Sequence, residues 1–78
     1  MKEYWSQYDE LCRSILANGN QLAYDELKKA ALYVNGMTDG WFEFLIAFET
    51  ALENHKLTDE QNKTARLLID VLRSRLEK

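Results

Sequence analysis

Two side chains in this sequence are of the types that enzymes use as nucleophile and base, the single cysteine Cys12 and the single histidine His55. Such a pair needs both groups within hydrogen-bond reach and a third group that orients the base. Helical spacing places Cys12 on the flank of an apolar stripe, where a buried thiol packs as a small hydrophobe. It places His55 in the last turn of a helix, where an imidazolium complements the helix dipole. We therefore expect structural roles for both, with a reactive thiol and a catalytic or metal-binding histidine as the alternatives.

Acid–base catalysis and metal binding need clusters that the sequence lacks. Adjacent acidic residues occur as pairs at positions 9–10, 25–26 and 59–60, but adjacent residues on a helix point about 100° apart and do not converge on one proton. A structural zinc site needs four Cys or His ligands, and this chain has one of each. The three glycines form no phosphate-binding loop. We predict no catalytic residues, no metal, no cofactor and no enzyme activity.

The stretch 40–52, GWFEFLIAFETAL, is the most informative for function. On a helix, one apolar stripe contains Trp41, Leu45, Phe48 and Leu52. Phe42 and Ile46 point about a quarter turn or more away from this stripe. Two interpretations follow. In one, the helix is the centre of a small bundle and both side chains belong to a wide core. In the other, both remain partly exposed as anchors of a binding face.

The charges around these two side chains favour a basic protein as the partner. Residues 39–55 carry four acidic side chains and no Lys or Arg, whereas residues 56–78 carry four acidic and six basic ones. Apolar anchors inside a charged rim are typical of protein-binding sites, and a negative rim attracts a positive surface. The predicted partner-binding residues are Asp39, Phe42, Glu43, Ile46, Glu49 and Glu53. The polar connector at 35–40 and Tyr33 extend this predicted surface.

Composition limits the class of protein and its partners. A chain of 78 residues with 46% hydrophobic residues predicts one globular domain, residues 1–78. The net charge of −3 argues against nucleic acid as the target. The sequence contains no run of about 20 apolar residues, which a membrane-spanning helix needs, and its most apolar segment is acidic rather than basic. A single cysteine and charged residues in the first positions favour a cytoplasmic protein without a signal peptide.

The elements that position these residues are predicted from helical periodicity and from capping residues. Helices are expected over 2–17, over 22–34, from a cap at Thr38 or Asp39 to about 54, and over 58–76. Gly40 is expected to allow a sharp entry into the third helix. Thr58 and Gln61 form a capping box at the start of the fourth. Short connections make successive helices antiparallel. The predicted fold is all-α, a small four-helix up-and-down bundle.

The last 48 residues resemble the small all-helical immunity proteins that protect bacteria from polymorphic or contact-dependent toxins. The matching features are the Asn35-Gly36 turn, the apolar and acidic stretch 40–52, and the capped helix that starts at residues 58–61. The resemblance implies a bacterial cytoplasmic protein that masks a toxin domain, commonly a basic nuclease, without catalysis. It transfers no role to any individual residue.

The leading hypothesis is therefore a non-enzymatic inhibitor that binds a basic protein. Three alternatives stay open. The first is a phage-encoded inhibitor of a host defence complex that uses the same acidic surface. The second is a structural homo-oligomer, such as a homodimer, that buries Phe42 and Ile46 against a second copy. The third is a DNA-binding regulator that uses the basic residues of the fourth helix.

Overall fold

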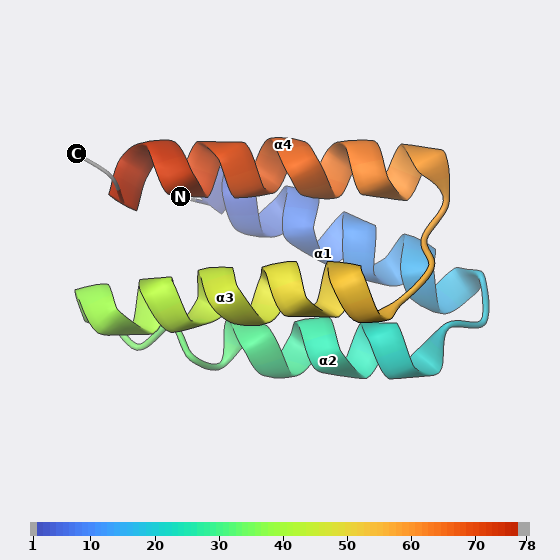
Figure 1. Cartoon of the computed structure of the whole chain (residues 1–78), viewed down its shortest axis with the longest axis horizontal. Helices are drawn as coiled ribbons and strands as arrows, with labels where there is room; N and C mark the ends of the chain where they lie inside the picture. The colour runs from blue at the N-terminus through green and yellow to red at the C-terminus, as the bar shows by residue number, and fades with distance from the viewer. Residues whose placement is uncertain (1, 77–78) are drawn as a thin grey trace.

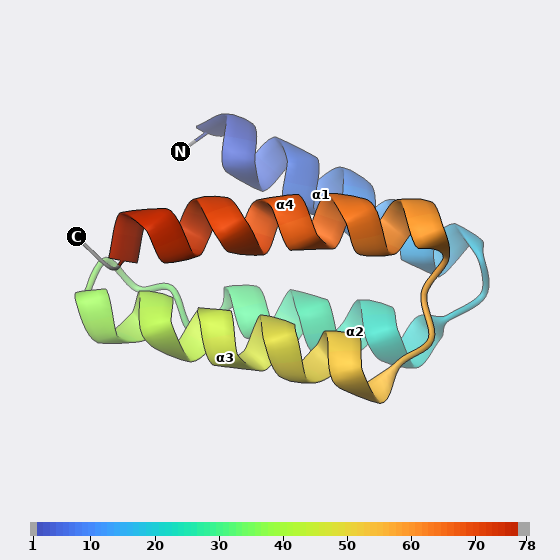
Figure 2. The same ribbon diagram turned by 45° about the horizontal axis from the view of Figure 1, so that its top comes forward.

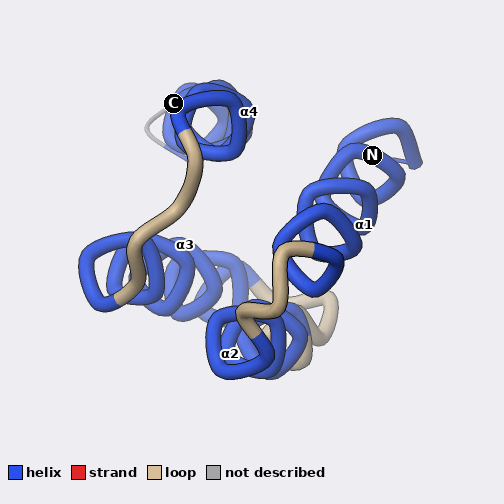
Figure 3. Tube along the Cα trace, turned by 90° about the vertical axis from the view of Figure 1, so that its right-hand side faces the viewer, coloured by secondary structure: helices blue, strands red, loops and turns tan. Residues whose placement is uncertain are grey.

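The computed structural model describes residues 2–76, apart from the side chain of Thr38. This part of the chain forms four helices, α1 (Lys2–Ala17), α2 (Gln21–Ala31), α3 (Thr38–Asn54) and α4 (Asp59–Leu76). Successive helices run in opposite directions, and α4 returns beside α1 (Figures 1 and 2). Each helix packs against its two neighbours in a ring, α1 with α2, α2 with α3, α3 with α4, and α4 with α1. Figure 3 shows this ring in a view along the helices. The predicted all-α four-helix up-and-down bundle is confirmed.

Gly19 ends α1 as predicted, whereas α2 ends at Ala31, before the predicted Asn35-Gly36 turn. Gly19 and Gly36 both have positive φ angles, 84° and 89°, which residues with a Cβ rarely adopt. After Ala31 the chain continues in tight turns, in which the amides of residues 32, 33 and 34 each bond to the carbonyl three residues earlier. This tighter hydrogen bonding is why α2 stops before the predicted residue 34.

The start of α3 differs from the prediction. The N-cap residue is Met37, whose side chain makes no capping bond, and Asp39 lies in the first turn of the helix. The expected cap by Asp39 is therefore wrong, and the side chain of Thr38 lies outside the described residues. Gly40 is buried inside the helix. A Cβ there would collide with the carbonyl oxygen of Tyr33 and lie 2.8 Å from Oδ1 of Asn35. Gly40 thus permits close packing of the connector, not a sharp chain entry.

The capping box at the start of α4 is confirmed. The amide of Gln61 donates to Oγ1 of Thr58, and the amide of Thr58 donates to Oε1 of Gln61, both at 3.1 Å. Gln61 is buried, and its Nε2 also donates to Oγ of Ser14 at 2.9 Å. The residue that caps α4 therefore also attaches this helix to α1.

An aromatic cluster fills the centre of the bundle. The ring of Tyr8 lies 5.2 Å from that of Phe44 and 5.1 Å from that of Phe48, measured between centroids and in edge-on geometry. Trp5 packs on Phe44 at 5.2 Å. The hydroxyl of Tyr8 donates to the carbonyl of Leu27 at 2.6 Å, so this buried group keeps a hydrogen bond. Helices α1, α2 and α3 are joined through one tyrosine.

Candidate functional site

The buried side of α3 is rotated from the stripe predicted from the sequence. Phe44 and Phe48 are fully buried, and Leu45 and Ala51 are also buried. The predicted core residues Trp41 and Leu52 are only partly buried at its edge. The prediction omitted Phe44, which lies one turn before Phe48 and belongs to the same face. A second stripe drawn through Phe44, Phe48 and Ala51 would have found it.

Phe42 and Ile46 lie on the outer face of α3. Their exposed fractions are 41% and 64%. The structure therefore supports the interpretation in which they are accessible, because α3 buries its apolar face between α2 and α4 and turns these two side chains outward. Large exposed apolar side chains that lie together in a monomer mark candidate interaction sites.

Three of the four predicted acidic residues share this outer face. Asp39, Glu43 and Glu53 are exposed and lie on the same side of α3 as Ile46 by helical spacing. We call Asp39, Phe42, Glu43, Ile46 and Glu53 the α3 face. Its five side chains lie together, and its net charge is negative.

Glu49 does not belong to the α3 face. Its carboxylate is only partly exposed and forms an ion pair with the guanidinium of Arg73 on α4. The sequence prediction grouped Glu49 with the other acids because all four lie on one helix. The pairing depends on α4 packing beside α3, which periodicity within α3 does not reveal.

A groove of about 490 Å³ between α2 and α3 adjoins the α3 face. Its floor consists of small side chains from both helices, Ala30, Ala47 and Ala51. Its borders include Tyr33 and Ile46, which are exposed, and Lys29, the one basic side chain of the lining. Lys29 was not among the predicted partner-binding residues, and Tyr33 lies in the turns that follow α2.

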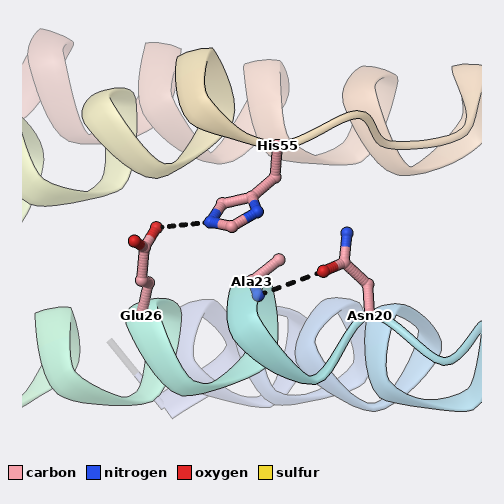
Figure 4. A network of polar contacts seen from close by, with 4 residues as sticks. All are labelled: Asn20, Ala23, Glu26 and His55. Atoms are coloured by element: carbon pink, nitrogen blue, oxygen red, sulfur yellow. Dashed lines mark hydrogen bonds and ion pairs between the residues drawn. The ribbon is translucent and has the colours of Figure 1, made fainter.

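His55 has a structural role that differs in detail from the prediction. It lies one residue beyond α3 in an extended conformation, so it is not in the last turn of the helix. Its Nε2 lies 2.7 Å from Oε2 of Glu26 on α2, as Figure 4 shows. The same view contains Asn20, whose Oδ1 accepts from the amide of Ala23 and caps α2. His55 and Glu26 therefore link the end of α3 to α2.

Cys12 is fully buried in the core, as expected for a packing residue. Burial raises the pKa of its thiol to about 11, and the nearby Asp9 carboxylate acts in the same direction, whereas Lys28 opposes it. Since the thiolate is the reactive form, a thiol with this pKa and no solvent contact is a poor nucleophile near neutral pH.

The described residues give no support for a metal site, a membrane-spanning helix or a basic stripe along α4. Within residues 2–76, no three His, Cys, Asp or Glu side chains lie close enough to hold a metal ion. In the same range, no helix is both long and apolar enough to cross a membrane. Basic and acidic side chains are intermixed along α4, as on a solvated helix surface.

Comparison of the chain with protein-family models, with curated proteins and with solved structures finds no match.

Proposed function

We propose that this protein is a non-enzymatic inhibitor that binds a basic protein through the α3 face. The observation that carries the proposal is the exposure of Phe42 and Ile46 beside three exposed carboxylates. Apolar anchors exclude water on binding, and the surrounding carboxylates steer and orient a positively charged surface.

The absence of a catalytic arrangement in the described residues agrees with an inhibitory role. Cys12 is buried with a raised pKa. His55 pairs with Glu26, and no nucleophile lies beside it in the described contacts. Together with the resemblance to immunity proteins, this favours a bacterial toxin domain as the partner. Its basic substrate-binding surface would be covered by the α3 face.

The test uses a charge reversal confined to the α3 face. Glu43→Lys combined with Glu53→Lys changes the net charge by four without altering a described ion pair or hydrogen bond. The partner is isolated by co-purification with the tagged protein from its native organism, and each variant is titrated against it by calorimetry at low salt. We expect at least about a tenfold loss of affinity and a matching loss of inhibition, because like charges then face each other.

The control is an equal charge reversal elsewhere. Glu10→Lys combined with Asp70→Lys changes exposed residues on α1 and α4 by the same total charge. This control should keep the wild-type affinity. Equal losses of affinity in both variants would show that only the net charge of the protein matters. Wild-type affinity in the Glu43 and Glu53 variant would show that the α3 face does not bind the partner.

A further inference from the structure

A second exposed apolar surface lies along α4, where this helix borders α1. Leu67 is 61% exposed and Val71 45%. Lys63 and Arg75 are exposed and lie one turn before Leu67 and one turn after Val71. Spacing of four residues places the four side chains in one row, which winds round the helix by about 40° at each step. We call Lys63, Leu67, Val71 and Arg75 the α4 stripe. Two grooves between α1 and α4, of about 520 and 380 Å³, run beside it.

The α4 stripe and the α3 face have complementary sequences of side chains. The α4 stripe reads base, apolar, apolar, base. Along the α3 face, Ile46 lies between the carboxylates of Glu43 and Glu53. At a rise of 1.5 Å per residue, the two acids are separated by about 15 Å and the two bases by about 18 Å. Acids can therefore face bases at both ends while apolar side chains meet in the middle.

The arrangement of the helices allows the two surfaces to meet between copies. In Figure 3, α2 and α3 form one side of the bundle, and α4 and α1 form the other. Consider a second copy that is moved, without rotation, in a direction perpendicular to the helices. Its α4 then lies on α3 of the first copy, and its α1 lies on α2 of the first copy. Since α3 and α4 run in opposite directions (Figure 1), Glu43 then lies toward Arg75 and Glu53 toward Lys63.

The flanks of this contact are complementary as well. The α1 side of the two grooves carries two carboxylates, Glu3 and Glu10, and one base, Lys2. The α2 side of the α2–α3 groove carries Lys29 and Glu26, and the carboxylate of Glu26 is already paired with His55. In the displaced arrangement α1 of one copy covers α2 of the next, which puts these acids on the same side as Lys29.

We infer that the chain associates with itself through a heterologous contact, in which the α4 stripe of one copy docks on the α3 face of the next. Such a contact uses different surfaces on the two copies, so a simple displacement does not close and produces open, growing assemblies. The contact covers the surface to which the proposed function assigns partner binding, so self-association and partner binding compete. The self-association itself does not depend on the proposed function.

Two variants that each block one surface test the inference. Ile46→Lys puts a base on the α3 face, opposite the bases of the α4 stripe. Leu67→Glu puts an acid in the α4 stripe, opposite the acids of the α3 face. Both side chains are exposed, so the fold is expected to persist, and thermal unfolding followed by circular dichroism checks this. Leu32→Lys, at a position 80% exposed just beyond the end of α2, is the matched control.

Sedimentation equilibrium at low salt is the measurement. Small contacts between proteins are weak, so concentrations up to about 1 mM are needed. Wild type and the Leu32 variant should form assemblies that grow with concentration and shrink in about 0.5 M salt. Each blocking variant alone should be monomeric. An equimolar mixture of the two should associate again, because the intact α4 stripe of the Ile46 variant fits the intact α3 face of the Leu67 variant, and the two altered surfaces carry opposite charges.

Three results would overturn the inference. One is a wild-type protein that stays monomeric over the whole concentration range. Another is an Ile46 variant that is monomeric while the Leu67 variant still dimerises, which indicates a symmetric α3 to α3 contact. The third is a mixture of the two blocking variants that stays monomeric. None of these measurements involves the proposed partner, so they leave the proposed function to its own test.

Discussion

The carbonyl oxygen of Tyr33 occupies the space that a side chain at Gly40 would need. This contact holds the connector between α2 and α3 against the first turns of α3. It therefore fixes the position from which Phe42 and Ile46 project, because both follow within two turns of Gly40.

Replacing Gly40 with alanine should destabilise the protein by about 1 to 3 kcal/mol, since the added methyl group forces backbone to move. This outcome opposes helix propensity, which favours alanine over glycine by about 1 kcal/mol. Chemical denaturation followed by circular dichroism measures the change. Thr50→Ala, at an exposed position of the same helix, is the control and should be neutral or slightly stabilising. A Gly40 variant as stable as wild type would contradict the close contact.

Removing the hydroxyl of Tyr8 should cost about 1 to 3 kcal/mol in the free energy of unfolding. Its hydrogen bond to the carbonyl of Leu27 is buried, so Tyr8→Phe leaves that carbonyl with one partner fewer. Tyr33→Phe removes a hydroxyl from a ring that is 48% exposed and should have little effect. Similar losses of stability in the two variants would show that the buried hydrogen bond contributes no more to stability than the exposed hydroxyl of Tyr33 does.

Gln61 should contribute to stability in two separable ways, through the cap of α4 and through its bond to Ser14. Gln61→Ala should cost about 1 to 2 kcal/mol, and Ser14→Ala should cost less because it removes only the second bond. A double-mutant cycle measures the coupling, which we expect to be about 0.5 kcal/mol or more. Additive effects of the two substitutions would argue against the α1 to α4 bond.

Alkaline pH should destabilise the protein through Cys12. Burial raises the thiol pKa from 9.0 to about 11, so the unfolded chain loses this proton at lower pH than the folded protein does. The resulting stability is complete below about pH 9 and is lost as the pH rises through about 11. Between pH 8 and 10, before tyrosine ionisation dominates, the loss should be about 1 kcal/mol.

The matched variant for this pH effect is Cys12→Ser, whose hydroxyl does not ionise in this range. It should be less stable than wild type at every pH, because a buried thiol is replaced by a more polar group. Its stability should change less than that of wild type between pH 8 and 10. Denaturation midpoints measured at several pH values give both curves, and parallel curves would rule out the contribution of Cys12.

Local sequence signals located the helices well where the deciding interactions are local. The capping box of Thr58 and Gln61 and the positive φ of Gly19 after α1 involve residues within a few positions of one another. Periodicity also separated Phe42 and Ile46 from the buried side of α3. It misplaced the centre of that side, because the position of Phe44 in the core depends on where α1 supplies Trp5 and Tyr8.

The amino-acid sequence by itself determined the number of helices, their approximate ends and the excess of acidic over basic residues on α3, because these depend on hydrogen bonds, spacing and charge within short segments. Only the tertiary structure decided which acidic side chains of α3 are accessible to a partner. Glu49 pairs with Arg73, whereas Glu43 and Glu53 lie on the α3 face. The pairing of Glu49 with Arg73 joins two helices, and its distance is set by helix packing, which the periodicity within a single helix does not reveal.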